Sequence, residues 1–331
     1  MIKLRLNIFG HINKFCTSQI HPDVSLFQRK GEGEVDTVLI TGTTSGIGAA
    51  FAEKFARERK NLVLVSRNKA KLQRQQTELQ SRHQVSVECI SCDLAEDGAI
   101  ELIADKAREL GLSVDVLINN AGFNETGYFT DTRLSEELDM IQVHIKVLTA
   151  LTKLFLPGMV ERGYGRILNV GSTGAYMPCP CDTVFAATKA YVLSFSNGLY
   201  QELKGTGVTV TCLCPGATKP LFAGKANIEN TLLFRLFVMQ PEDIASIGYK
   251  SLMKGKRTTT AGLYNKLLVF SSKLLPISVI NSIVQCKFCQ SIFYFWWVFW
   301  VDCSLNDFLN FQFTKLLRQG LGGDFAIRFP P

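Results

Sequence analysis

The stretch from Val35 to Gly48, with the sequence V-D-T-V-L-I-T-G-T-T-S-G-I-G, constrains the fold more than any other part of this chain. Residues 38–40 form a short apolar run of the kind that makes a buried strand, and residues 49–59 follow a helical pattern. A glycine-rich turn lets the backbone approach a phosphate, and the helix after it offers free N–H groups. The glycine spacing is G-x-x-x-G-x-G, not G-x-G-x-x-G, and a plain tight turn is the alternative interpretation.

Three further motifs follow the turn in order. Asn119-Asn120-Ala121-Gly122 comes after an apolar strand at 114–118, and Ser172 comes after another at 166–170. Lys189 stands seventeen positions after Ser172 on a predicted helix. With the glycine turn, these motifs resemble the short-chain dehydrogenase/reductase family over residues 35–275. The resemblance implies a nicotinamide dinucleotide cofactor and a carbonyl or alcohol substrate.

The alternation of strand and helix patterns predicts an α/β fold, a Rossmann-type doubly wound parallel sheet of about seven strands. A chain of 331 residues with 47% hydrophobic residues is long enough for one such core. Residues 1–34 and 276–331 are extensions of this single domain. Strands are expected at 38–40, 61–65, 85–91, 114–118, 166–170, 208–213 and 258–263. Helices are expected at 49–59, 69–82, 96–110 and 134–155, around Lys189, and from Gln240-Pro241 onward.

The resemblance also implies which residues bind the dinucleotide. Arg67 ends the second strand, where an acid would bind a free ribose 2′-hydroxyl, so its charge favours NADP(H) over NAD(H). The alternative is that Arg67 only stacks on adenine. Asp93 is expected near the adenine amine, or as the N-cap of the helix at 96–110. The other expected cofactor residues are Gly42, Ser45, Gly46, Ile47, Gly48, Asn120, Lys189, Pro215, Gly216 and Thr218.

The catalytic motif departs from the family pattern. The resemblance implies Tyr-x-x-x-Lys on one helix face, in which the lysine holds the nicotinamide ribose and lowers the pKa of the tyrosine hydroxyl. Here Phe185 stands four positions before Lys189 and thirteen after Ser172. Ser172 is expected to polarise the substrate carbonyl, but phenylalanine has no proton to give. Positioned acid–base catalysis contributes roughly 10²–10⁴-fold in rate, or on the order of 3 to 5 kcal/mol.

Three other side chains are candidates for the missing proton donor. His144 stands where the resemblance implies an asparagine that holds a helix bulge and a relay water. An imidazole there relays protons or is simply a hydrogen-bonded core residue. Tyr176 is expected in a loop from which it could reach inward, whereas Tyr191, two positions past Lys189, is expected to face elsewhere.

Composition limits the partners and the compartment. The net charge is +7 without a dense basic run interleaved with aromatics, so nucleic-acid binding is not expected. Ten cysteines without a clear secretory signal favour a reduced intracellular setting, cytoplasmic or membrane-associated. Cys286 and Cys289 form a lone C-x-x-C, which does not predict a metal site. A homo-oligomer is compatible with this composition.

The terminal segments leave several interpretations open. Residues 1–34 mix basic and apolar residues, as in a surface helix, a transit peptide, an unstructured extension or a misplaced start. Between residues 267 and 301 the only charges are Lys273 and Lys287, and all three tryptophans lie in 291–301. This tail fits interfacial membrane attachment, a subunit interface or frame-shifted sequence. Residues 220–239 are expected to form a lid over an apolar substrate pocket.

Two main hypotheses for function follow. The first is an NADP(H)-dependent oxidoreductase acting on an apolar carbonyl or alcohol, with His144, Tyr176 or water in place of the tyrosine. The second is a catalytically impaired dinucleotide-binding protein that acts as a sensor or partner. A damaged gene product without selected activity is a third interpretation.

Overall fold

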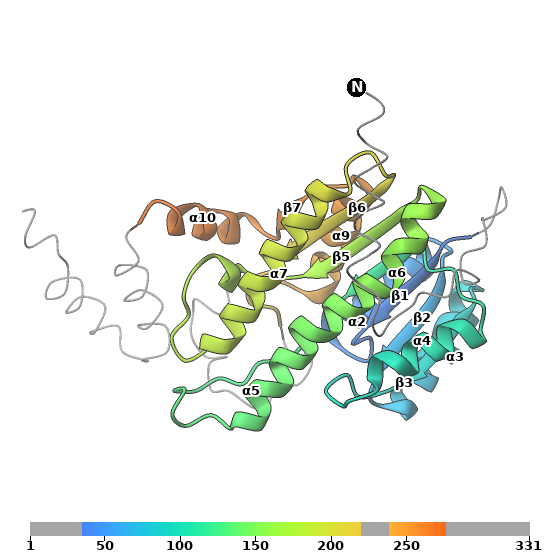
Figure 1. Ribbon diagram of the computed structural model, residues 1–331, viewed down its shortest axis with the longest axis horizontal. Coiled ribbons are helices and arrows are strands. Elements are labelled where there is room, and N and C mark those ends of the chain that lie inside the picture. The colour runs from blue at the N-terminus through green and yellow to red at the C-terminus, as the bar shows by residue number, and fades with distance from the viewer. Residues whose placement is uncertain (1–34, 220–237, 276–331) are drawn as a thin grey trace, which may run out of the picture. The chain divides into compact units, whose positions relative to one another are not determined.

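The structure is a computed structural model that describes residues 35–219 and 238–275. These residues form a seven-stranded parallel sheet with helices on both faces (Figure 1). The strand order is β3-β2-β1-β4-β5-β6-β7, so the chain winds outward from β1 in one direction and then from β4 in the other. The predicted doubly wound fold is therefore confirmed, and the carboxyl ends of β1 and β4 lie side by side at the point where the winding reverses.

The element bounds follow the sequence prediction in most places. The strands are β1 Thr37–Thr41, β2 Asn61–Ser66, β3 Val87–Ser91, β4 Val116–Asn119, β5 Gly165–Val170, β6 Val208–Cys214 and β7 Thr258–Thr260. The helices are α2 Gly46–Arg57, α3 Lys69–His83, α4 Ala99–Glu109, α5 Leu134–Ile141, η2 Gln142–Val147, α6 Leu148–Arg162, η3 Thr173–Tyr176, α7 Thr183–Glu202, α9 Pro241–Met253 and α10 Leu263–Ser272.

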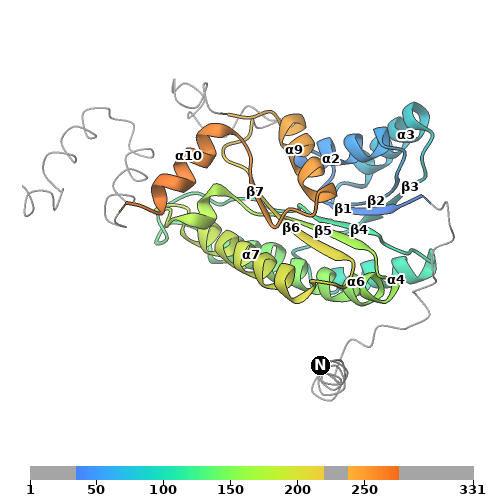
Figure 2. The same cartoon turned by 90° about the horizontal axis from the view of Figure 1, so that it is seen from above.

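The sheet is buried on both faces, which explains its uninterrupted apolar strands. In β1, Val38 and Ile40 pack toward α2, α3 and α9, whereas Leu39 packs toward α4 and α6. Figure 2 shows the two layers, with α2, α3 and α9 above the sheet and α4, α6 and α7 below it. The sheet is therefore the middle of three layers, with one layer of helices packed on each face.

One long helical run, Leu134–Arg162, carries the π-helical segment η2 in its middle. The predicted end before Pro157 is wrong, because the helix continues to Arg162. Met159 extends the buried face of Leu154 and Phe155 past the proline. The carbonyl that Pro157 leaves without a partner belongs to the exposed Lys153, where water can reach it. This run is long and apolar enough to span a membrane, but 56% of its apolar window is buried inside the fold, as expected of a core helix.

Two other boundaries differ from the prediction. The α4 helix begins at Ala99 because Gly98, at φ +86°, forms its N-cap, so Asp93 does not cap it. Instead Asp93 Oδ1 accepts a hydrogen bond from the backbone N–H of Ala95 at 3.0 Å. β7 ends at Thr260, and the predicted strand to Leu263 is replaced by α10 after a turn at Gly262. Pro241 opens α9 as predicted. Residues 220–237 of the predicted lid at 220–239 lie outside the described residues, as do both extensions.

Candidate active site

The glycine turn between β1 and α2 is packed against the end of β4. Gly42 has φ +71°, a conformation that favours glycine, and a Cβ on it would lie 2.8 Å from the Cα of Ala121. A Cβ on Gly48 would lie 2.1 Å from the carbonyl oxygen of Gly42. A Cβ on Gly46 would meet nothing within 4 Å. The turn therefore needs glycine for its own packing at two positions, and it is open at Gly46, beside the first turn of α2.

The side chain of Asn120 holds this turn in place. Its amide Nδ2 donates to the carbonyls of Thr41 at 2.9 Å and Gly42 at 3.1 Å. The hydroxyl of Thr41 accepts from the backbone N–H groups of Asn120 and Ala121, both at 3.0 Å. Asn120 therefore ties β1 to β4, as its motif predicted, and its cofactor contact stays a prediction.

The adenosine end of the expected cofactor site lies at the carboxyl end of β2. The Arg67 side chain is 73% exposed and its guanidinium is 3.4 Å from Asp93 Oδ2, a weak surface pair. Ser66 Oγ is hydrogen-bonded to Thr44 Oγ1 at 2.9 Å, which joins this strand end to the glycine turn. Arg67 is thus beside the turn and free to reorient toward an anionic ligand.

Lys189 is buried at the centre of the candidate site. Its Nζ donates to the carbonyl oxygen of Val170 at 3.0 Å and lies 5.5 Å from the centre of the Phe185 ring. Burial lowers the pKa of Lys189 from 10.5 to about 8, and the nearby thiols of Cys212 and Cys214 oppose that shift. Ser172 is half-buried after β5, and its Oγ accepts from the backbone N–H of Gly174 at 3.1 Å. The structure thus brings Ser172, Phe185 and Lys189 to the carboxyl ends of the central strands.

His144 is fixed by a directed chain of hydrogen bonds. Its Nε2 accepts from the backbone N–H of Phe123 at 3.2 Å, so its Nδ1 carries the proton and donates to Thr188 Oγ1 at 2.9 Å. The Thr188 hydroxyl in turn donates to the carbonyl of Phe185 at 2.8 Å. Burial, and next the charge of Lys189, lower the pKa of His144 from 6.5 to about 2.

This geometry describes a neutral imidazole whose two nitrogens are both engaged. His144 sits in the π-helical segment, and its ring meets the Phe185 ring edge-on at 5.8 Å between centroids. A Cβ on Gly122 would lie 2.5 Å from His144 Nε2, so this glycine makes room for the larger side chain. The imidazole therefore supports the backbone around Phe185, and it stays neutral near neutral pH with both ring nitrogens in hydrogen bonds.

The hydroxyl groups of both candidate tyrosines contact other side chains. Tyr176 Oη points to Cys214 Sγ at 3.7 Å, and burial raises the pKa of Tyr176 above its ordinary range. Tyr191 Oη pairs with Thr149 Oγ1 at 2.9 Å on another side of α7, as expected. Cys212 and Cys214 lie beside each other on β6, 3.7 Å between sulfurs, which places two buried thiols near Lys189.

The segment after β6 closes the site from the other side. A Cβ on Gly216 would lie 2.3 Å from Asn265 Oδ1, and Asn265 donates to the carbonyl of Ala261 at 2.7 Å. Thr218 forms an isolated bridge with Met239. Pro215 accepts from the backbone N–H of Thr173 through its carbonyl at 2.9 Å. Sequence reasoning missed Asn265, because no helix was predicted where α10 lies. It also missed Thr188, whose role depends on His144.

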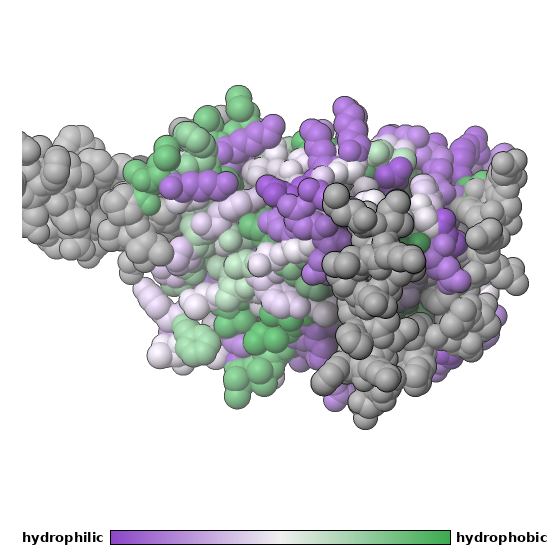
Figure 3. Space-filling view, turned by 45° about the horizontal axis from the view of Figure 1, so that its top comes forward, coloured by the Kyte–Doolittle hydropathy of each residue, from purple (hydrophilic) through white to green (hydrophobic). Residues whose placement is uncertain are grey.

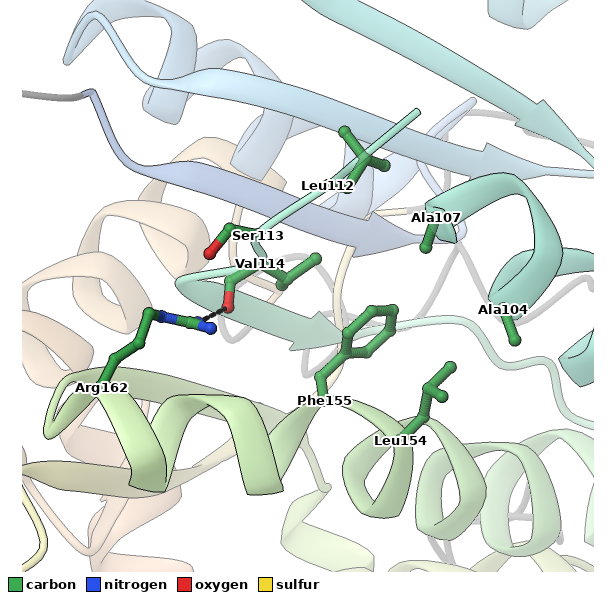
Figure 4. A pocket seen from close by; sticks show the side chains of 8 residues that line it. All are labelled: Ala104, Ala107, Leu112, Ser113, Val114, Leu154, Phe155 and Arg162. Atoms are coloured by element: carbon green, nitrogen blue, oxygen red, sulfur yellow. Dashed lines mark hydrogen bonds between the residues drawn. The ribbon is translucent and has the colours of Figure 1, made fainter. Parts of the chain in front are cut away.

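Two small cavities lie near the sheet, and neither has room for a substrate. One, of about 10 Å³, is bordered by Thr41, Asn119, His144 and Lys189 behind the site. The other, shown in Figure 4, lies at the opposite end of β4, where Arg162 donates to the carbonyl of Val114 at 2.8 Å. Each has room for about one water molecule. Among residues 35–219 and 238–275, no group of three His, Cys, Asp or Glu is placed to hold a metal ion.

Comparison with known proteins identifies the class of protein. The family model described as short chain dehydrogenase matches residues 36–230, more than half of the chain. The chain therefore belongs to the short-chain dehydrogenase/reductase family, as its motifs predicted. The Phe185-for-tyrosine replacement and the roles of the site residues stay predictions.

Individual proteins of this family are similar to the chain in sequence. The very-long-chain 3-oxoacyl-CoA reductase of Homo sapiens is 35% identical over 192 residues, covering 56% of this chain and 60% of the relative. The match thus spans less than two thirds of that reductase. The hydroxysteroid dehydrogenase-like protein 1 of Gallus gallus is 32% identical over 264 residues, covering 78% of this chain and 76% of the relative.

A solved structure of similar fold contains a bound nucleotide. The short-chain dehydrogenase from Sphingobium yanoikuyae in complex with NADPH has a TM-score of 0.64 and 32% identity. The match covers 72% of this chain and 95% of that one.

Proposed function

We propose that this chain binds NADP(H) and a large apolar carbonyl or alcohol compound, with its capacity for carbonyl reduction strongly reduced. One observation carries this proposal. One helical turn before Lys189 the structure has the ring of Phe185, and the nearby His144, Tyr176 and Tyr191 all have their polar atoms engaged elsewhere.

The residues present fit a dinucleotide. The turn that Gly42 and Gly48 pack closely leaves open space at Gly46 beside the first N–H groups of α2, which suits a pyrophosphate. The exposed guanidinium of Arg67 would meet a ribose 2′-phosphate. Lys189 would hold the nicotinamide ribose. When bound, NADPH supplies a hydride to a carbonyl carbon.

The chain's own residues retain part of the chemistry around such a carbonyl. The Ser172 hydroxyl can turn its proton toward a substrate oxygen and stabilise negative charge there. The Phe185 ring preserves packing against His144 but supplies no proton. Losing a positioned acid costs about 10²–10⁴-fold in rate. The site thus favours binding over turnover.

The substrate class is inferred from the relatives. One relative is named a reductase of very-long-chain 3-oxoacyl-CoA and the other a hydroxysteroid dehydrogenase-like protein. A 3-oxoacyl thioester and a steroid ketone share a carbonyl on a large apolar body. We therefore propose that such a compound binds with its carbonyl at the Ser172 hydroxyl.

A slow reductase is the second candidate, and the lowered pKa of Lys189 favours it. An ammonium whose pKa is about 8 gives up its proton more readily than an ordinary lysine. Through a water molecule at the end of the Phe185 ring, Lys189 would return a proton to the substrate oxygen. Activity would then fall as pH rises through about 8.

The test compares the wild type with Phe185→Tyr. NADPH oxidation is followed with 3-oxoacyl-CoA thioesters and steroid ketones, after NADPH binding to both proteins is measured by titration. We expect binding in both, and a rate about 10²–10⁴-fold higher in the variant. Phe195→Tyr is the matched control, because Phe195 lies on the same helix and stacks on Tyr191, away from Lys189. Equal rates in wild type and Phe185→Tyr would contradict the impairment, and failure to bind either pyridine nucleotide would contradict the whole proposal.

A further inference from the structure

The last described helix, α10, presents its apolar side to the outside. Leu263, Leu267 and Phe270 are 74%, 59% and 62% exposed. The side that packs against the fold contains Val269 and the polar Asn265, which are 7% and 5% exposed. A surface helix of a globular domain normally has the reverse arrangement. The exposed apolar residues of α10 thus lack the burial that their chemistry favours.

These three residues form one continuous stripe. Their spacing of four and then three positions places them on one face of an α-helix. Figure 3 shows hydrophobic residues gathered over α10 at the upper left, with hydrophilic residues beside them. Lys266 lies next to this stripe around the helix axis and is exposed, as is Lys273 just past the helix end.

The charge pattern selects the partner. From Leu263 to Val301 the sequence has three lysines, Lys266, Lys273 and Lys287, and no acidic residue. The same stretch contains all three tryptophans of the chain, within residues 291–301. Aromatic and apolar side chains flanked by lysines, with no acid, are typical of segments that lie at the surface of anionic membranes. A second copy of the chain would instead bring like-charged lysines toward one another.

We propose that α10 docks on the surface of an anionic phospholipid bilayer, with Leu263, Leu267 and Phe270 in the headgroup boundary and Lys266 on the lipid phosphates. The stripe lies along the surface and does not span it, since ten residues of helix are far shorter than a bilayer core. The α10 helix also lies beside η3, because the Lys273 ammonium is 5.7 Å from the Tyr176 ring. Docking there would place the bilayer near Ser172. The proposed docking does not depend on whether the site catalyses a reaction.

The fold offers a matched control on another helix. In α5, Leu134, Leu138 and Ile141 have the same spacing and are 72%, 54% and 39% exposed. That helix carries Glu136 and Asp139 on its surface instead of lysines. Apolar exposure alone would make the two stripes equivalent for lipid binding, whereas charge makes only α10 suitable.

The experiment uses the full-length chain and sedimentation with vesicles. Vesicles of phosphatidylcholine alone are compared with vesicles containing about 25% phosphatidylserine. We expect the wild type to prefer the anionic vesicles and the double variant Leu267→Glu/Phe270→Glu to bind them about tenfold or more weakly. The control Leu134→Glu/Leu138→Glu should bind as the wild type does. Lys266→Glu, which leaves the apolar stripe intact, should weaken binding about fivefold or more.

Three outcomes would overturn the proposal. One is wild-type affinity in both Leu267→Glu/Phe270→Glu and Lys266→Glu, which would assign lipid binding to another segment. Another is an equal loss in the α10 and α5 double variants. The third is a wild-type dimer, seen by light scattering, that Leu267→Glu/Phe270→Glu converts to a monomer without any change in vesicle binding. Should the double variant fail to fold, Lys266→Glu decides alone.

Discussion

The ammonium of Lys189 lies 5.5 Å from the centre of the Phe185 ring, one helical turn away on α7. A phenylalanine at this place keeps the packing of the turn but leaves the buried charge facing a ring face with no hydroxyl. The only hydrogen bond that Lys189 donates within the described residues goes to the carbonyl of Val170. The charge is therefore poorly compensated, and burial lowers the pKa of Lys189 to about 8.

This buried charge makes the free energy of unfolding change with pH in the alkaline range. Because the pKa of Lys189 is lower in the folded state, about 8 against 10.5, the unfolded chain binds more protons between these values. Stability contributed by this site therefore rises with pH from about 8 to 10.5, by up to about 3 kcal/mol. In Lys189→Met this rise should vanish. Urea unfolding of both proteins from pH 7 to 10 measures the difference, and parallel pH curves would contradict it.

The neutral imidazole of His144 makes the free energy of unfolding depend on pH in the acid range. Its pKa is lowered from 6.5 to about 2 in the fold, so the unfolded chain binds more protons between these values. Stability is complete above pH 6.5 and is lost as pH falls, by about 2 kcal/mol at pH 5. Urea unfolding of wild type and His144→Asn at pH 7 and 5 tests this, since the variant should lose less. A His144 ring that titrates near pH 6 by NMR would show the prediction to be wrong.

The parts of this fold that were predictable from the sequence are those that local patterns determine. The apolar run at 38–40 and the glycines after it fix a strand and a turn without reference to the rest of the chain. The continuation of α6 past Pro157 was not predictable, because it depends on burial of Met159 in the core. The α10 helix was missed because its apolar residues point outward, against the usual pattern.

The candidate site shows the same division. Ser172 and Lys189 were predicted by their spacing, and Lys189 donates to the carbonyl of Val170, two positions before Ser172. Their roles in the site stay predictions. The chain from Phe123 through His144 to Thr188 joins residues far apart in sequence, so no local pattern indicates it. A signal was nonetheless present: Gly122, next to the asparagine motif, has the small size that the His144 ring requires.

Replacing two helical glycines, Gly48 and Gly198, by alanine should change the stability of the fold in opposite directions. A Cβ on Gly48 would lie 2.1 Å from the carbonyl oxygen of Gly42, so Gly48→Ala must move the turn and should destabilise the fold by more than about 1 kcal/mol. A Cβ on Gly198, in α7, would meet nothing within 4 Å. Gly198→Ala should stabilise by about 1 kcal/mol through helix propensity. Thermal unfolding compares the two, and shifts in the same direction would contradict the packing at Gly48.

Arg67 predicts which nucleotide the site prefers. Its guanidinium is 73% exposed and only weakly paired with Asp93, so little is lost when it turns to a 2′-phosphate. Arg67→Ala should weaken NADPH binding about ten- to a hundredfold and leave NADH binding nearly unchanged, because only NADPH has that phosphate. Fluorescence titration with both nucleotides measures the effect. Arg108→Ala, which removes an arginine paired with Asp105 on α4, is the control and should change neither affinity. Equal losses for NADPH and NADH in Arg67→Ala would mean that the arginine stacks on the adenine ring that both nucleotides share.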